Sequence, residues 1–149
     1  MPFAAIRDEI ATQLATVSGI GQTHNRWRFW KDRGGKITLA FSSDILNVWF
    51  IRRVGVESVA KSGGAVTRTH IFDLAGFYEF DDANESETTF QNLIDGVMDK
   101  FDDSANLGLS NTGDQTESAE LIEFGDEMLG DHLCHAVIVR IQVVEDAGC

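Results

Sequence analysis

The sequence predicts an α+β fold with a mainly antiparallel, or mixed, sheet of about four to five strands and two helices packed on one face. Two segments carry apolar residues at helical spacing, and the other apolar runs alternate or are rich in β-branched residues, as strands are. Because the second helix falls between two groups of strands, an antiparallel sheet joins these elements by short connections. At 149 residues, the chain suits one domain, which we expect to span residues 1–149.

The first helix is predicted near the N-terminus from apolar residues at steps of three and four. These residues are Phe3, Ile6, Ile10 and Leu14. Pro2 suits the first turn of this helix, and Gly19 suits its exit. Residues 24–30 then mix aromatic and basic side chains, which indicates a strand or an aromatic loop. The glycine pair within residues 31–43 indicates a turn that joins two extended pieces.

Two strands follow, separated by a segment with few residues that could join a core. Residues 47–54 are rich in β-branched and aromatic side chains, which predicts a strand. In residues 70–80 the large apolar residues share one face at period two, which predicts another. Between them, residues 57–69 contain a Ser-Gly-Gly triplet, so we expect a mobile loop or a hairpin tip.

The clearest element is an amphipathic helix in the second half of the chain. Its apolar residues are Phe90, Leu93, Ile94, Val97, Met98 and Phe101. Asn84 and Glu87 are predicted to cap its N-terminus as a pair. Residues 102–118 are rich in small polar residues, and we expect a second mobile loop there. The last strands are predicted over residues 119–124 and 133–144, the second with one apolar face and one polar face.

The charge is acidic overall and unevenly distributed along the chain. The net charge of -12 argues against nucleic-acid binding as the main task, because such binding uses Lys and Arg to neutralise phosphates. Residues 20–68 contain nine basic and three acidic side chains, whereas residues 69–149 contain two basic and nineteen acidic ones. Two interpretations stay open: both groups are solvated surface, or the molecule has two poles that meet in a head-to-tail assembly.

No set of residues in the sequence predicts catalysis or a cofactor site. The Gly-Ile-Gly run at residues 19–21 lacks the third glycine and the preceding strand of a dinucleotide-binding loop. His132 and His135 flank Cys134, but residues three apart on a strand point to opposite faces, so a structural or surface role is a better interpretation than a metal site. We therefore expect no enzymatic activity, no cofactor and no bound metal.

The number of cysteines and the hydropathy pattern indicate the cellular compartment in which we expect the protein. The two cysteines, Cys134 and Cys149, are too few for a disulfide framework, and we find no leader-like segment, so we expect the reducing cytoplasm. Cys149 is expected to be a mobile free thiol, because no base is fixed near it. The sequence has no run of about eighteen apolar residues, so we expect no membrane partner.

One cluster has the composition of a protein–protein interface, because Trp and Arg most often anchor such contacts. Its members are Arg26, Trp27, Arg28, Trp30, Arg33, Trp49, Arg52 and Arg53. Two other interpretations stay open. Trp27 and Trp49 could belong to the core, with the arginines reaching solvent from their strands. The rings could also stack on single-stranded nucleic acid, which the net charge disfavours.

The order of the predicted elements resembles one known family. The resemblance is carried by the N-terminal helix ending at residues 17–20 (Val-Ser-Gly-Ile), the long middle region, the strand at 70–80, the helix at 90–101 with the Asn-Leu-Gly-Leu run at 106–109, and the strand at 136–144. Over nearly the whole chain, this layout is similar to the tail terminator, or tail-completion, proteins of long-tailed phages and related particles. The likeness lies in order and spacing, so it assigns no role to individual residues.

The resemblance implies a structural virion protein of the tail and neck, assembled in the host cytoplasm. Members form a six-fold ring that caps the finished tail tube, stops its polymerisation and offers a surface for head–tail joining. The implied partners are other copies of the chain, the tail tube protein and a head-side connector or stopper, while DNA only passes through the acidic channel. Two alternatives stay open: another neck component, such as a head–tail stopper or adaptor, and a small acidic adaptor or inhibitor that acts as a monomer.

Overall fold

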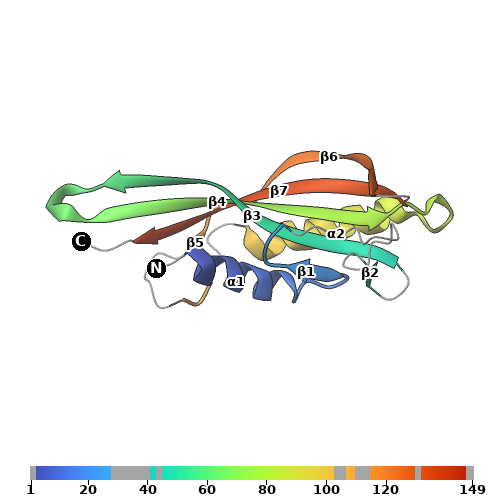
Figure 1. The fold of residues 1–149 in the computed structure, drawn as a ribbon, viewed down its shortest axis with the longest axis horizontal. Coiled ribbons are helices and arrows are strands. Elements are labelled where there is room, and N and C mark those ends of the chain that lie inside the picture. The colour runs from blue at the N-terminus through green and yellow to red at the C-terminus, as the bar shows by residue number, and fades with distance from the viewer. Residues whose placement is uncertain are drawn as a thin grey trace.

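The computed structural model describes residues 3–27, 41–42, 45–102, 107–109, 115–129 and 132–146. Two α-helices, seven strands and two short 3-10 turns occur within these ranges (Figure 1). In chain order they are α1 (Phe3–Leu14), β1 (Gln22–His24), β2 (Phe41–Ser42), β3 (Ile45–Ala60), η2 (Ser62–Gly64), β4 (Val66–Glu79), η3 (Asp82–Asn84), α2 (Ser86–Phe101), β5 (Gln115–Thr116), β6 (Glu120–Leu129) and β7 (His132–Asp146).

The strands form one mixed sheet in which the long strands β3, β4 and β7 lie side by side. The order along the main path is β1-β3-β4-β7-β5. Strand β2 shares the outer edge of β3 with β1, and β6 shares the outer edge of β7 with β5. The β1–β3 pairing is parallel, and the other described pairings are antiparallel. The predicted α+β class with a mainly antiparallel sheet is therefore confirmed.

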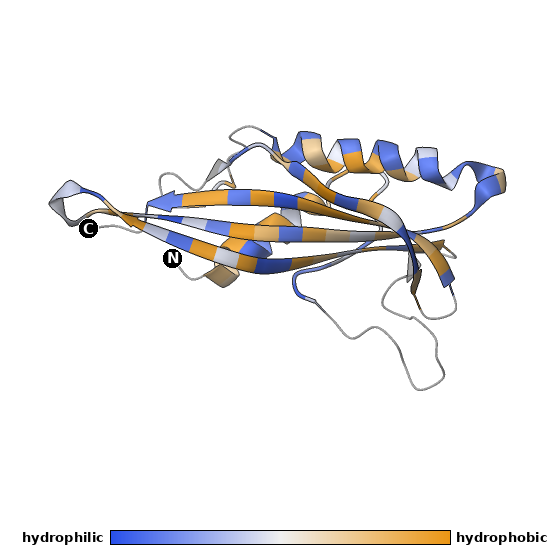
Figure 2. Cartoon of the chain, turned by 90° about the horizontal axis from the view of Figure 1, so that it is seen from above, coloured by the Kyte–Doolittle hydropathy of each residue, from blue (hydrophilic) through white to orange (hydrophobic). Residues whose placement is uncertain are grey.

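Both helices cover the same face of the sheet, which we call the helix face. Most helical residues predicted to point inward do so: Ile6, Ile10 and Leu14 of α1 are fully buried, as are Phe90 and Val97 of α2. Phe3, predicted on the same stripe, is instead 38% exposed, because it lies in the first turn against the Arg53 guanidinium and not in the core. The buried helical residues pack against side chains of the three long strands, namely Trp49, Ile51, Phe72, Leu74, Val137, Val139, Ile141 and Val143. The strands accordingly show alternating hydrophobic and hydrophilic bands in Figure 2, because successive side chains point to opposite faces.

The opposite face, which we call the open face, carries a second and smaller apolar cluster. Its buried members are Leu46, Val48, Phe50, Ala75, Phe77, Leu129 and Cys134. Neither described helix contributes to this cluster. The side chains that bury it come from the strands themselves and from aromatic residues near β1, such as His24, whose ring stacks on Phe50 at a centroid distance of 5.3 Å.

The β3–β4 hairpin extends beyond both helices as a projecting arm, which we define as residues 54–69 (Figure 1). The loop expected over residues 57–69 is wrong for most of that range, because β3 continues to Ala60 and β4 begins at Val66. The alternative of a hairpin tip is confirmed at residues 61–65. Backbone pairing explains the difference, since the ladder runs on to the Ala60–Val66 pair without needing core side chains.

Two smaller expectations are also wrong in part. The N-cap of α2 is Glu85, in a left-handed conformation, and not Asn84. The Asn84 amide donates instead to the Asp81 carboxylate at 2.6 Å, which closes the preceding turn. The predicted loop at 102–118 includes ordered contacts where it is described: β5 pairs with β7, and Leu107 is buried in the core. Residues 103–106 and 110–114 of this segment lie outside the described ranges.

The close contact between Gly76 and Trp49 gives a test of the core. A β-carbon on Gly76 would lie 2.6 Å from the Trp49 ring, so alanine forces the ring to move within a packed layer. We expect Gly76→Ala to lower the free energy of unfolding by about 1 to 3 kcal/mol in urea denaturation. Gly125→Ala is the control, because nothing lies within 4 Å of a β-carbon there, and a change below about 0.5 kcal/mol is expected. Equal effects of the two substitutions would contradict the packing described.

Candidate interaction site

The eight residues predicted to form an interface do not form one surface. Arg28, Trp30 and Arg33 lie outside the described residues. The other five, Arg26, Trp27, Trp49, Arg52 and Arg53, are distributed over three environments: the core, the open face and the helix face.

Trp49 belongs to the core and is not an interface residue. Its side chain is fully buried on the helix face, and its ring lies 6.0 Å from that of Phe90 on α2. Gly76 on the neighbouring strand provides the space for the ring. The prediction that Trp49 anchors a partner is therefore wrong, and the interpretation of Trp49 as a core residue holds.

Trp27 and Arg52 meet on the open face. Trp27 packs against Phe50 with ring centroids 5.3 Å apart, and the Arg52 guanidinium lies 6.0 Å from the Trp27 centroid, a cation–π arrangement. Trp27 nevertheless keeps 46% of its surface exposed. A large, half-exposed aromatic residue held by its neighbours is typical of an interface anchor. Arg26 is also exposed and donates a hydrogen bond to Asn25 at 3.1 Å.

A groove of about 310 Å³ lies on the open face beside Trp27, and we call it the open-face groove. Trp27, Arg52 and Val54 line one side, and β6 lines the other with Glu123 and Glu127 among its residues. The floor comes from the central strands, through Ala75, Phe77, Ala136 and Ile138. The groove thus combines an apolar floor, an aromatic wall and an acidic wall, which suits a protein segment with apolar and basic side chains.

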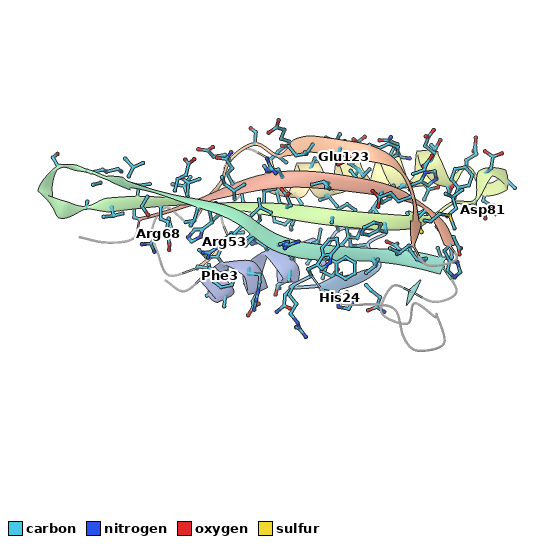
Figure 3. The ribbon with its side chains drawn as sticks, turned by 45° about the horizontal axis from the view of Figure 1, so that its top comes forward. Phe3, His24, Arg53, Arg68, Asp81 and Glu123 are labelled. Carbon is cyan, nitrogen blue, oxygen red and sulfur yellow. The ribbon has the colours of Figure 1, made fainter. Side chains whose placement is uncertain are left out.

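Arg53 lies on the helix face, in a different network from Arg52. Its guanidinium lies over the Phe3 ring at 4.3 Å, and Figure 3 shows the two side chains together near the start of α1. Arg53 Nη1 lies 3.5 Å from His70 Nδ1, and His70 Nε2 lies 2.8 Å from Glu145 Oε1. His70 and Glu145 are both buried, and Arg68 adds a second cation 3.7 Å from the same carboxylate. The network ties the base of the arm to β7.

This network predicts a stability effect that a surface site would not have. His70→Ala removes the nearest hydrogen-bond partner of the buried Glu145 carboxylate, and the loss of a buried partner of this kind costs about 1 to 3 kcal/mol. We expect a loss of that size in urea denaturation. Thr69→Ala is the matched control, because Thr69 is the adjacent residue, points to the other face and is only half-buried, so a loss below about 1 kcal/mol is expected. Comparable losses would show that the network contributes no special stability.

Sequence reasoning missed a hydrogen-bonded chain of serine, histidine and aspartate. Ser86 Oγ lies 2.8 Å from His135 Nε2, and His135 Nδ1 lies 2.9 Å from Asp126 Oδ1. Ser86 begins α2, whereas the other two residues pair across β6 and β7. Ser86 and His135 are 49 positions apart, so no local motif points to their contact. Only the packing of α2 on the sheet brings them together.

The same three residue types serve as nucleophile, base and orienting acid in many hydrolases. Two observations favour a structural role here. The backbone N–H of Asp81 donates to Ser86 Oγ at 2.8 Å, which makes the hydroxyl part of the turn before α2. The adjoining cavity of about 210 Å³ is lined by the acidic residues Asp82, Glu85 and Glu87, whose charge would oppose the oxyanion of an acyl-transfer reaction.

We therefore expect Ser86 to be unreactive. Incubation of the folded protein with a fluorophosphonate probe should leave its intact mass unchanged, and hydrolysis of p-nitrophenyl acetate should match that of the Ser86→Ala variant. A known serine hydrolase in parallel controls for the reagents. An adduct mapped to Ser86, together with ester hydrolysis lost in Ser86→Ala, would establish a catalytic site and overturn the expectation of no enzymatic activity.

The histidines and cysteine near the start of β7 lie as the sequence predicted. His132 and Cys134 belong to the open face, whereas His135 points to the helix face, where its ring lies 4.8 Å from that of Phe80. Burial raises the pKa of the Cys134 thiol to about 12. The described residues contain no group of three or more His, Cys, Asp or Glu side chains arranged to hold a metal ion.

Strand β6 carries exposed acidic side chains along one outer edge of the sheet, and we call this strand the acidic edge. Its exposed acids are Glu120, Glu123, Asp126 and Glu127. No described strand pairs with the outer side of β6, and Leu121 and Met128 are exposed along it at 41% and 62%. An unpaired outer strand offers backbone N–H and C=O groups to another chain, and the acids along it restrict which chains can approach.

The sequence matches no protein-family model and no curated protein. Neither of the described helices is long and apolar enough to cross a lipid bilayer.

Proposed function

We propose that this chain is a structural subunit of a phage tail, a tail terminator that assembles into a six-fold ring, caps the tail tube, stops its growth and provides the surface for head–tail joining. The observation that carries the proposal is the projecting arm. In this view the chain acts by contact alone and catalyses no reaction. Its partners are other copies of itself, the tail tube protein and a head-side connector or stopper, and it resides in the virion after assembly in the host cytoplasm.

The arm leaves apolar side chains and a strand edge exposed. Val54, Val56 and Val59 are exposed at 47%, 45% and 60%. From Arg52 onward, the outer edge of β3 pairs with no described strand, since β1 and β2 end their pairing at Phe50. A strand edge with β-branched exposed residues tends to pair or pack with another chain. An ordered arm of this kind is more useful to an assembling subunit than to a monomeric enzyme or inhibitor.

A closed ring also needs two different patches on each subunit. The arm is formed by β3 and β4. The acidic edge is formed by β6, which pairs with β7 at the opposite edge of the sheet from β3. The arm, residues 54–69, contains two basic side chains and one acidic one, the adjacent Arg52 and Arg53 add two more basic side chains at its base, and residues 117–129 contain five acids and no Lys or Arg. This arrangement supports the two-poled interpretation of the charge over that of an ordinary solvated surface.

The alternatives differ in what they require of the molecule. A small acidic adaptor or inhibitor would work as a monomer, so light scattering and negative-stain images of the purified protein separate it from a ring. A head–tail stopper or adaptor would also form a ring, but it would bind the connector and not the tube. Co-sedimentation with tubes polymerised from the tail tube protein of the same particle separates this alternative from a terminator.

The role of the arm predicts an assembly defect without unfolding. Val56→Asp combined with Val59→Asp places two charges on the arm, and we expect rings in the wild type and monomers in the variant by light scattering, because desolvating a carboxylate in a contact is costly. Circular dichroism should be unchanged, since both valines are exposed. Gln91→Asp, at an exposed position of α2, is the control and should assemble normally. Monomeric wild type up to high concentration would contradict the proposed function.

A further inference from the structure

We propose that the tip of the arm of one copy lies in the open-face groove of the next copy and supplies the head-to-tail contact of the ring. This inference rests on the proposed function and names its partner surface. The occupant is a second copy of this chain, with Val59 over the groove floor and Lys61 against its acidic wall.

The groove has the chemistry to receive such a segment. Its floor is apolar, through Ala75, Phe77 and Ile138, and can desolvate an aliphatic side chain. The half-exposed Trp27 ring forms one wall, and burial of its remaining surface by a partner would stabilise the contact. Glu123 and Glu127 on the opposite wall are exposed, so a basic side chain of the incoming copy would lie close to both carboxylates.

The arm tip carries the complementary set. Val59 is the most exposed of the three exposed arm valines, at 60%, and Lys61 lies two positions further on, at the turn. Arg68 returns along β4 on the same arm, and its side chain is partly exposed at 38% (Figure 3). The tip is apolar with one basic side chain, while the groove has an apolar floor, Glu123 and Glu127 on one wall and Arg52 on the other. A contact that brings Lys61 to the acidic wall, on the side away from Arg52, pairs opposite charges and covers both exposed apolar surfaces.

The arm cannot occupy the groove of its own chain. Strands β3 and β4 form part of the groove through Arg52, Val54, Asp73, Ala75 and Phe77, and they run from it as a continuous ladder to the tip. A strand cannot fold back on itself without losing that ladder. Figure 3 shows Glu123 on β6, well away from the arm tip of the same chain. An arm tip in the groove therefore belongs to another copy. Repeating a contact between two different patches gives a ring when the rotation between subunits closes and a filament when it does not, and the proposed function corresponds to the closed case.

The groove volume sets the scale of the contact. About 310 Å³ accommodates a few side chains and not a whole strand. The inferred contact is therefore an anchor that sets the register between subunits, and other surfaces, such as the acidic edge, add buried area. Because Lys61 and the two glutamates remain near solvent, their attraction should weaken with added salt.

Cysteine cross-linking tests the contact directly. In a Cys149→Ser background, Cys134 stays as the buried thiol whose high pKa makes it slow to react with maleimides at neutral pH. Val59→Cys combined with Glu123→Cys, treated with a short bismaleimide, should give a ladder of covalent oligomers on a denaturing gel. Val59→Cys combined with Asp99→Cys is the control, because Asp99 is exposed on the outer side of α2 and should give little cross-linking.

Mixing the single variants shows whether the contact joins two copies. Val59→Cys mixed with Glu123→Cys should give cross-linked dimers and no larger species, since each chain has one reactive end. Cross-linking that stays within the monomer in the double variant would mean that the same chain fills the groove, and it would overturn the inference.

A charge exchange provides the second test. Lys61→Glu, and separately Glu123→Lys with Glu127→Lys, should raise the concentration needed for half-assembly by about threefold to tenfold at low salt, and less at high salt. The three changes together should restore assembly. Val59→Asp should raise that concentration by more than about tenfold. If the wild type forms rings while the exchange has no effect and the cross-link is absent, this contact is wrong and the proposed ring stands. If no oligomer forms at all, the proposed function itself fails.

Discussion

Strand β4 is hydrogen-bonded to β3 on one side and to β7 on the other, and the rest of the described structure depends on these two ladders. The pairing with β3 runs from Tyr78 to Val66, and the pairing with β7 runs from Glu79 to Thr67. Backbone hydrogen bonds need no particular side chain, so they keep the strands extended beyond the part covered by the helices. The core and the arm are consequently one continuous structure, and the buried network around His70 and Glu145 lies where one passes into the other.

The alternation of side chains along these strands divides the molecule into two chemically different faces. The helix face is dry and packed, with Trp49 and Phe90 among its largest side chains. The open face retains a half-exposed tryptophan, a groove and an acidic wall. Arg52 and Arg53 are adjacent in the sequence, yet the first contacts Trp27 and the second contacts Phe3. These neighbouring arginines therefore lie in two different environments, one beside the half-exposed Trp27 and one in the network at the base of the arm.

The exposed edge strands β3 and β6 carry bulges and charged side chains that oppose nonspecific aggregation. A bulge interrupts the register of β3 between Arg53 and Gly55, and another interrupts β6 between Leu121 and Glu123. Bulges and charges at edges discourage indiscriminate strand pairing. The arm has two basic side chains against one acid and β6 is acidic, so two β6 edges repel each other, whereas an arm and a β6 edge attract. This charge rule favours head-to-tail contacts over symmetric pairing of two β6 edges.

The sequence by itself determined the two helices, parts of the four longer strands β3, β4, β6 and β7, and the α+β class, because each depends on local periodicity, whereas the short strands β1, β2 and β5 have no such signal. Helical spacing placed Ile6, Ile10 and Leu14 correctly, and period two separated His132 from His135. Tertiary structure decided the features that depend on partners far along the chain. Among these are the ordered arm over most of 57–69, the burial of Trp49, the Ser86–His135 contact and the open-face groove, whose walls come from residues about one hundred positions apart. Composition marked Trp27 and Trp49 alike as candidate anchors, and only their positions on the sheet show that the first is available to a partner and the second is not.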